Sequence, residues 1–259
     1  MSSPKGQFVW HELVSNDAKA SLDFYGHVVG WTSSAMPTGD GGTYHVLEAG
    51  KRGMGGVFQI PKGAAGSGMK PGWVGYIGSD DVDADLVRLK KAGGTGHRPA
   101  EDIPNVGRFA PVSDPQGAGF LLFKPQPPPG AVPERATGVG SVGWAELSTT
   151  DWKAAYAFYS EVFGWKKDQA MDMGPMGTYQ LFTTGDGPAV GGMMNRADPS
   201  APPGWLYYFN VAGIDAAAGR VKAKGGAVTH GPVEVPGGQW IIQCRDPHGA
   251  AFALVADKR

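Results

Sequence analysis

Two glutamates stand inside otherwise apolar, strand-like segments of this 259-residue chain, and each follows a tryptophan. Glu12 comes shortly after Trp10, and Glu146 comes shortly after Trp144. In an extended strand alternate side chains lie on the same face, so each glutamate shares a face with its tryptophan. A carboxylate beside an indole can act as a general acid or base, or orient a polar ligand. The alternative is a structural carboxylate, satisfied by backbone donors or by an arginine.

Large aromatic and methionine side chains accompany these glutamates. Such side chains can wall an apolar cavity for a flat organic ligand, and the alternative is ordinary packing between a sheet and its helices. The candidate ligand-binding residues are Trp10, Phe58, Trp73, Trp144, Met194 and Trp205. His45 is a further candidate, as a hydrogen-bonding group in a strand-like segment.

These residues recur because the chain is internally duplicated. A repeat indicates that one structural unit was copied, and loop insertions explain small changes in spacing. The blocks that recur in the same order include Trp10-His11-Glu12-Leu13 with Trp144-Ala145-Glu146-Leu147, Phe24-Tyr25 with Phe158-Tyr159, Gly30-Trp31 with Gly164-Trp165, Gly55-Gly56 with Gly191-Gly192, and Asp114-Pro115 with Asp246-Pro247. Eight such blocks in order establish the duplication.

Each copy predicts two successive strand–helix–three-strand units, which is typical of the α+β class. Asp17 and Asp151 suit the N-caps of amphipathic helices that end near Val29 and Phe163. The proline-rich segment between the copies cannot form a helix or a central strand. We therefore expect a first domain at residues 6–124, a linker at 125–138 and a second domain at 139–257.

Composition excludes several function classes. The net charge of −1 provides no electrostatic footprint for nucleic acid, and no apolar run is long enough to span a membrane. The single cysteine, Cys244, lies in an apolar segment and is expected to be an inert buried thiol. We expect a cytoplasmic protein whose partner is a small molecule, and which is either a monomer that acts as a pseudo-dimer or a homodimer.

The sequence resembles the vicinal oxygen chelate superfamily, which includes glyoxalase I, bleomycin-resistance proteins and extradiol dioxygenases. The segments that carry the resemblance run from Asp17 to Trp31 and from Asp151 to Trp165, together with Asp114–Ala118 and Asp246–Ala250 ahead of the last strand of each copy. The resemblance implies paired units whose sheets curl into an open, ligand-binding cup. It also implies up to two such clefts per chain.

Metal-dependent members of this superfamily collect His and carboxylate ligands from the cup. The resemblance places the first-strand ligand at Trp10 and Trp144, the fifth-strand ligand at or beside Trp73-Val74 and Trp205-Leu206, and the eighth-strand ligand at Leu121 and Ala253. Near the fourth strand the polar candidates are Gln59 and Asn195. Since indole and aliphatic groups do not bind divalent cations, we expect no cofactor and no family-type metal site.

Three functions remain open from the sequence. The first is a metal-independent protein that binds an aromatic or apolar small molecule in one or both cups. The second is a lyase, isomerase or dioxygenase-type enzyme that uses Glu12 and Glu146, or an unconventional divalent metal site. The third is a non-catalytic scaffold that associates through the edges of its sheets.

Overall fold

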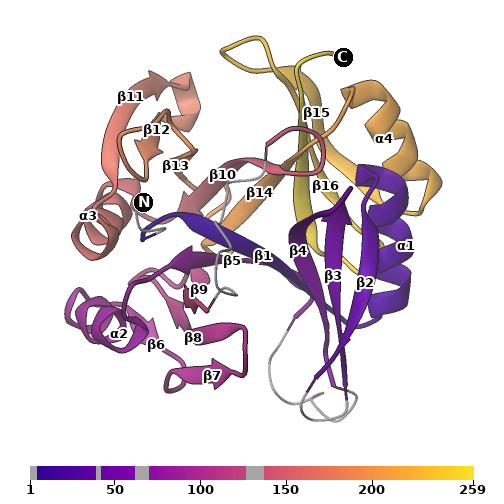
Figure 1. The fold of residues 1–259 in the computed structure, drawn as a ribbon. Helices are drawn as coiled ribbons and strands as arrows, with labels where there is room; N and C mark the ends of the chain where they lie inside the picture. The colour runs from indigo at the N-terminus through magenta and orange to yellow at the C-terminus, as the bar shows by residue number, and fades with distance from the viewer. Residues whose placement is uncertain (1–4, 39–41, 62–69, 127–136) are drawn as a thin grey trace. The chain divides into compact units, whose positions relative to one another are not determined.

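A computed structural model describes residues 5–38, 42–61, 70–126 and 137–259 of the chain. Most of the predicted linker therefore falls outside the described residues. The described chain forms four modules, each a strand followed by a helix and further strands (Figure 1). The α+β class and the duplicated architecture predicted from the sequence are confirmed.

The bounds of the four modules are as follows. Module 1 comprises β1 (Phe8–Ser15), α1 (Ala18–Val29), β2 (Thr32–Pro37), β3 (Thr43–Ala49) and β4 (Arg52–Gln59). Module 2 comprises β5 (Gly72–Gly78), α2 (Val82–Lys91), β6 (Thr95–Gly96), β7 (Glu101–Ile103), β8 (Gly107–Ser113) and β9 (Gly119–Pro125). Module 3 comprises β10 (Val142–Thr149), α3 (Trp152–Phe163), β11 (Lys166–Asp172), the short 3₁₀ helix η1 (Gly174–Met176), β12 (Thr178–Thr183) and β13 (Gly191–Asn195). Module 4 comprises β14 (Gly204–Asn210), α4 (Ile214–Ala223), β15 (Ala227–Glu234), β16 (Trp240–Arg245) and β17 (Ala251–Ala256).

The first helix of each half begins and ends where the sequence predicts. Asp17 caps α1 by accepting a hydrogen bond from the Ala20 amide at 2.9 Å, and Asp151 caps α3 in the same way. Gly30 closes α1 at a φ of 93°, in the left-handed region that glycine tolerates best. These local signals fix the helix that follows each glutamate-bearing strand.

The strands form two sheets. The nine-stranded sheet runs in the order β2, β3, β4, β1, β5, β9, β8, β6, with β7 paired to β8. The eight-stranded sheet runs in the order β11, β12, β13, β10, β14, β17, β16, β15. Within a module the first strand pairs in parallel with the last, as β1 does with β4 and β10 with β13.

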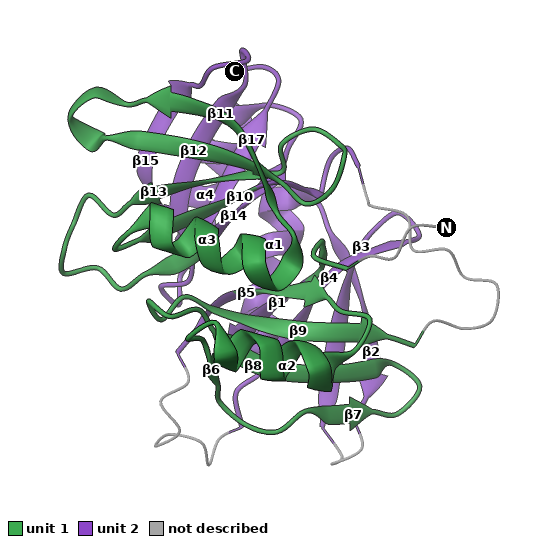
Figure 2. Cartoon of the chain, turned by 90° about the vertical axis from the view of Figure 1, so that its left-hand side faces the viewer, with its two compact units in different colours: residues 1–10, 74–135, 145–205 green, residues 11–73, 136–144, 206–259 purple. Residues whose placement is uncertain are grey.

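The compact units of the chain do not coincide with its two halves. The described parts of the first unit are residues 5–10, 74–126 and 145–205, so it combines module 2 with module 3. The second unit consists of residues 11–61, 70–73, 137–144 and 206–259, and it combines module 1 with module 4 (Figure 2). Each hydrophobic core is thus built from both halves of the sequence.

In the second unit α1 lies beside α4 (Figure 1). Arg220 of α4 donates a hydrogen bond from Nε to the Val28 carbonyl oxygen at 3.0 Å, where a cation complements the C-terminal end of α1. Lys224 and Asp23 form an ion pair between the same helices at 2.7 Å. The two helices are therefore joined by polar contacts as well as by packing.

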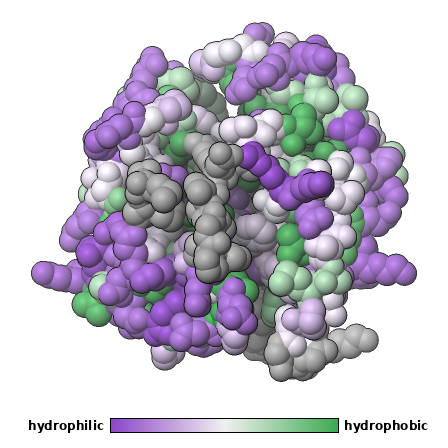
Figure 3. Space-filling view, viewed as in Figure 1, coloured by the Kyte–Doolittle hydropathy of each residue, from purple (hydrophilic) through white to green (hydrophobic). Residues whose placement is uncertain are grey.

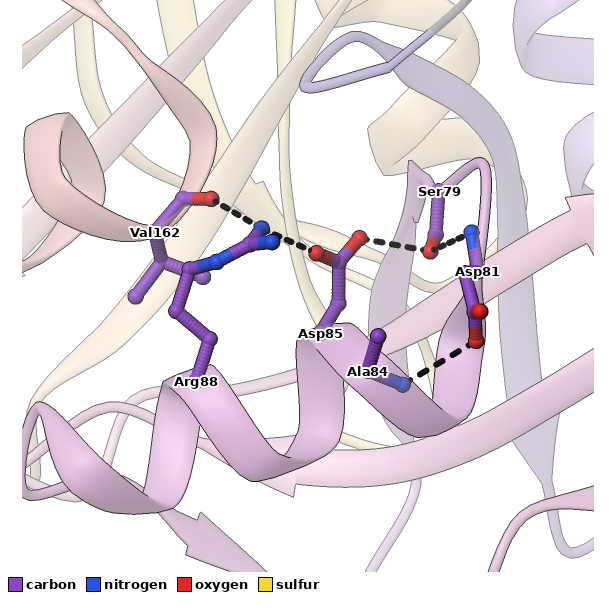
Figure 4. Close-up of polar contacts among 6 residues, drawn as sticks. All are labelled: Ser79, Asp81, Ala84, Asp85, Arg88 and Val162. Carbon is purple, nitrogen blue, oxygen red and sulfur yellow. Dashed lines mark hydrogen bonds and ion pairs between the residues drawn. The ribbon is translucent and has the colours of Figure 1, made fainter.

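The first unit contains the corresponding contact between α2 and α3. Arg88 reaches the Val162 carbonyl oxygen at 3.5 Å and also pairs with Asp85 (Figure 4). The hydroxyl group of Ser79 donates to the other carboxylate oxygen of Asp85 at 2.6 Å. Because Asp85 is buried, these two partners offset the cost of desolvating its charge.

None of the helices in the described part of the chain is long and apolar enough to cross a bilayer. On the face drawn in Figure 3 the hydrophobic residues form separate small groups among hydrophilic ones. Cys244 is buried as predicted, and burial raises the pKa of its thiol to about 12.

Candidate functional site

The side chains of β1 alternate between two environments. His11, Leu13 and Ser15 are buried, whereas Trp10 and Glu12 are half-buried. The same alternation holds in β10, where Ala145 and Leu147 are buried while Trp144 and Glu146 are half-buried. The shared face of glutamate and tryptophan that the sequence predicts is therefore borne out by the alternation along both strands.

In module 3 the glutamate is held by a tyrosine. Tyr179 of β12 donates a hydrogen bond from Oη to Oε2 of Glu146 at 3.1 Å. The strand between them contributes Gly192, which is paired with Glu146 across β10 and β13. A Cβ atom at Gly192 would collide with the Tyr179 ring, so the absence of a side chain lets the ring lie across β13.

In module 1 a glycine likewise makes room for a tyrosine ring. Gly56 is paired with Glu12 across β1 and β4, and a Cβ atom there would collide with the ring and hydroxyl group of Tyr44. The second glycine of each pair, Gly55 or Gly191, lies on the opposite face. There a side chain would meet the backbone of β1 or β10. The doubled glycines thus allow close approach on both faces of one strand.

Apolar side chains flank each glutamate–tyrosine pair. Phe58 is paired with Val14, and Met194 is paired with Ser148, so both lie on the glutamate face of their module. We call these surfaces the glutamate faces. That of module 1 includes Met36, Glu12, Val14, Tyr44, Gly56 and Phe58, and that of module 3 includes Met171, Glu146, Ser148, Tyr179, Gly192 and Met194.

Trp73 is buried and Trp205 is half-buried, and both pack in aromatic clusters where their indole nitrogens are hydrogen-bonded. Trp73 donates from Nε1 to the hydroxyl oxygen of Tyr25 at 2.9 Å, and Tyr25 donates to Oδ2 of Asp246 at 3.2 Å. In the first unit Trp205 donates to Tyr159 at 3.2 Å, and Tyr159 donates to Asp114 at 3.3 Å. These chains serve packing, where Trp and Tyr require partners for their polar atoms.

Electrostatics reflect this burial. Burial raises the pKa of Tyr25 well above its ordinary value, and the nearby charge of Asp246 acts in the same direction. Burial also raises the pKa of Asp114, although backbone donors at Ala118 and Gln116 favour its charged form. The aspartates of the two Asp-Pro motifs are therefore buried acceptors that receive hydrogen bonds from a tyrosine of the other half.

His45 also lies away from the glutamate face. It is paired with Val57, which is fully buried on the opposite side of β4 from Gly56. The corresponding Gln180 is buried and donates to the backbone oxygen of Asp168 at 2.9 Å. The sequence alone did not indicate this. Alternation shows which side chains of one strand share a face, but it does not show which face of the sheet that is.

The polar candidates near the fourth strand cap helices. The Gln59 Oε1 atom accepts from the Ala18 amide at 2.7 Å, and its Nε2 donates to the Asn16 oxygen at 2.6 Å. In module 3 the Oδ1 atom of Asn195 accepts from the Trp152 amide at 2.8 Å. Each side chain therefore accepts from the first residue of its own module's helix, α1 or α3.

The residues present do not fit a metal of the type that the resemblance implies. The expected eighth-strand positions are occupied by aliphatic residues. They are Leu121, which is paired with Tyr76, and Ala253, which is paired with Tyr208. Within the part of the chain that the structure describes, no group of three His, Cys, Asp or Glu side chains is arranged to hold a metal ion. Indole and hydrocarbon side chains supply no ligand atoms.

Comparison with known proteins agrees with this architecture. The sequence profile of the Glyoxalase/Bleomycin resistance protein/Dioxygenase superfamily matches residues 7–122 and 141–254. The chain belongs to this superfamily. Its fold resembles a Mn(II)-bound glyoxalase from Novosphingobium aromaticivorans, with a TM-score of 0.69, 16% identity, and coverage of 99% of this chain and 83% of that one. The 2,3-dioxygenase LapB from Pseudomonas sp. KL28 gives a TM-score of 0.68 at 12% identity, with coverage of 99% and 93%.

Two relatives are similar in sequence over nearly their whole length. CFP32 of Mycobacterium tuberculosis, named as a suspected glyoxylase, is 33% identical over 247 residues, which cover 95% of this chain and 93% of that protein. The anthracycline biosynthesis protein DauV of Streptomyces sp. strain C5 is 32% identical over 262 residues, covering 96% and 93%. Both alignments include the two halves.

Sequence reasoning missed the two tyrosines and the two methionines of the glutamate faces. Tyr44 and Tyr179 recur in the duplicated blocks, as do Met36 and Met171, and this recurrence was an available signal. Met36 is paired with Tyr44, and Met171 is paired with Tyr179. Only the strand register showed that these side chains lie on the same face as the glutamates.

Proposed function

We propose that this protein binds an aromatic small molecule at its half-exposed sheet faces without a bound metal. The observation that carries the proposal is the hydrogen bond from Tyr179 to Glu146 at 3.1 Å, on a surface that also carries Met171 and Met194. Ligand sites of this kind combine apolar walls with a few fixed polar groups. A tyrosine held over glycine fixes the direction of the carboxylate.

The chemistry of this pair defines a class of ligand. A carboxylate offers about four acceptor positions, so it can accept from a ligand hydroxyl or amine in addition to Tyr179. The thioethers of Met171 and Met194 are polarizable and pack well against aromatic rings. A flat aromatic molecule with a hydrogen-bond donor on its edge fits both properties.

The name of a relative supports the same class. DauV is named as an anthracycline biosynthesis protein, and an anthracycline is a planar, polycyclic aromatic compound that carries hydroxyl groups. We therefore choose the anthracycline daunorubicin as the first probe. If daunorubicin does not bind, the proposed class of ligand is contradicted.

A second candidate function is an enzyme of the lyase, isomerase or dioxygenase type. It is favoured by the name of CFP32, and by the presence of a carboxylate that can accept a proton. A titration with daunorubicin distinguishes the two functions, because an enzyme converts the compound that it binds. Mass spectrometry of the recovered compound detects such conversion.

The test measures quenching of tryptophan fluorescence while daunorubicin is added, before and after treatment with a chelator. We expect saturable binding that survives chelation, and we expect Glu146→Gln to weaken it because an amide oxygen is a poorer acceptor than a carboxylate. Glu161→Gln, an exposed change on α3, serves as the matched control and leaves binding unchanged. Binding that requires a stoichiometric metal would overturn the metal-independent function. Absence of any saturable binding would favour the third function, a non-catalytic scaffold protein.

A further inference from the structure

Methionines gather where the chain turns from β11 into β12 in module 3 (Figure 1). Three of the nine methionines of the chain stand within residues 171–176, namely Met171, Met173 and Met176, and we call these three the methionine tip. The corresponding segment of module 1 holds Met36 and no further methionine up to Tyr44. The methionine tip is therefore a feature of the second half that the duplication does not explain.

The backbone holds the methionine tip in one tight turn. Met173 donates from its amide to the Gly177 carbonyl oxygen at 2.8 Å, and its own carbonyl oxygen accepts from the Met176 amide at 3.3 Å. A hydrogen bond of this kind keeps the Cα atoms of the first and fourth residues within about 7 Å of each other. The Asp172 carboxylate accepts from the Gly174 amide at 2.9 Å, which fixes the start of the turn.

Met171 and Met173 lie on the same side of the hairpin. They are alternate residues at the end of β11, and alternate side chains of a strand share a face with Cα atoms about 6.6 Å apart. Burial shows the same alternation, because both methionines are half-buried while Asp172 between them is exposed. Two thioethers therefore emerge side by side from one strand.

Met176 brings the third thioether to the same turn. It is 52% exposed, so its sulfur is accessible from solvent. Methionine is unbranched and has three rotatable bonds, so its side chain adapts to its surroundings without a change in the backbone. All three sulfur atoms are therefore within reach of a single ion at the end of the hairpin.

The chemistry of the thioether decides which ion this is. Soft sulfur ligands such as methionine select Cu(I), whereas carboxylate, carbonyl and water oxygens suit Mg(II), Ca(II) and Mn(II). The carboxylate of Asp172 adds a negative charge beside the three neutral ligands, which favours a cation. In the described part of the chain no group of three His, Cys, Asp or Glu side chains offers a competing site.

We propose that the methionine tip is a binding site for a soft monovalent cation, Cu(I) or its analogue Ag(I). Met171, Met173 and Met176 supply the ligands, and the turn between β11 and β12 holds them together. The site is separate from the proposed function, which concerns the glutamate face and needs no metal. Met171 is the residue that the two surfaces share, since it is paired with Tyr179.

The first experiment titrates the full chain with silver nitrate in chloride-free buffer while NMR follows the methyl signals of labelled methionine. We expect one equivalent of Ag(I) to shift the signals of the methionine tip. Met36 is the internal control, because it is a lone methionine that is 47% exposed, and its signal should not move. Mg(II) should shift none of these signals, since it prefers oxygen ligands.

The second experiment compares variants by calorimetric titration with the same salt. Met173→Leu and Met176→Leu keep an apolar side chain but remove the sulfur. Each should weaken Ag(I) binding by at least about tenfold, since even the partners of a metal ligand change affinity by that factor. Met36→Leu is the matched control and should stay within about twofold of wild type. Cys244→Ala removes the only thiol, which is buried, and should also leave the site intact.

Two results would overturn the proposal. One is silver binding that leaves the methyl signals of the methionine tip in place. The other is a double variant, Met173→Leu with Met176→Leu, that binds Ag(I) as tightly as wild type. Thermal denaturation shows whether the variants are folded, and the wild-type NMR titration decides the matter if they are not. Daunorubicin binding is measured separately, so failure here leaves the proposed function standing.

Discussion

Tyr25 donates a hydrogen bond from its hydroxyl group to Oδ2 of Asp246 at 3.2 Å, although 221 positions of sequence separate the two residues. The same hydroxyl oxygen accepts from Nε1 of Trp73. Tyr25 is fully buried, so neither partner can turn to water if the hydroxyl group is lost. The contact ties the helix of module 1 to the Asp-Pro turn of module 4.

Replacing Tyr25 with phenylalanine should lower the free energy of unfolding by about 1–3 kcal/mol, because it strands a buried indole donor and removes one donor from Asp246. Urea denaturation measures the change. Tyr156→Phe is the matched control, since Tyr156 is partly exposed and donates only to the Trp165 carbonyl oxygen. An effect of Tyr25→Phe no larger than that of the control would contradict a structural role for this network.

Asp114 should make stability depend on pH. Its ordinary pKa is 3.8, and burial raises the pKa in the folded chain, so the folded state holds the proton more tightly than the unfolded state. The stabilisation is complete below pH 3.8 and is lost as the pH rises through the folded pKa. Asp114→Asn removes this titration. Urea midpoints measured upward from about pH 3.8 should therefore fall more in wild type than in the variant. Parallel curves would show that Asp114 titrates alike in both states.

Cys244 should resist thiol reagents. Burial raises its pKa to about 12, so the reactive thiolate is scarce at neutral pH and the sulfur is shielded. A chromogenic disulfide reagent should react with less than one equivalent in native protein and with one in urea. Above pH 9, the ordinary value of this thiol, the same shift should lower stability as the pH rises toward 12. Rapid reaction in native buffer would contradict the buried placement.

Gly192 should tolerate no side chain without displacing its neighbour. Gly192→Ala places a methyl group against the Tyr179 ring, and we expect a loss of about 1–3 kcal/mol together with weaker ligand binding. Gly219→Ala is the control, because an added Cβ in α4 meets nothing within 4 Å. That change should stabilise the protein by about 0.5–1 kcal/mol through helix propensity. Equal effects of the two substitutions on stability would contradict the role of Gly192 in making room for the Tyr179 ring.

Cutting the chain between its halves should not separate them. A protease site inserted after residue 126 yields two fragments, each of which contributes one module to each compact unit. We expect both fragments to elute together in gel filtration without denaturant, and to separate only in urea. If they separate in native buffer, then each half folds on its own. The measurement requires only a mass determination across the elution peak.

Local sequence signals predicted the elements well. Asp17, Gly30 and their counterparts set the helix bounds, and alternation in β1 and β10 put each glutamate on the face of its tryptophan. The functional face of other strands was harder to predict. Trp73 lies one position from Val74, and a shift by one residue moves a side chain to the opposite face of a sheet. The register that resolves this depends on contacts between strands far apart in sequence.

No local sequence pattern predicted that each compact unit combines a module of the first half with a module of the second half. Each half contains a complete set of strand and helix patterns, and nothing in their periodicity states which module supplies the opposite wall of a core. Recurrence of Tyr25 as Tyr159 and of Asp114 as Asp246 did mark the residues involved. Their hydrogen bonds within each unit show that the recurring positions are partners across the duplication.

The interleaved cores bear on how such a duplicated gene can change. A copy that loses its ligand-binding role is ordinarily free to decay or to be deleted. Here each copy completes a hydrophobic core of the other, as the Tyr25–Asp246 and Tyr159–Asp114 contacts show. Deleting either copy would therefore remove half of both cores. Selection for folding would therefore retain either half even if that half bound no ligand.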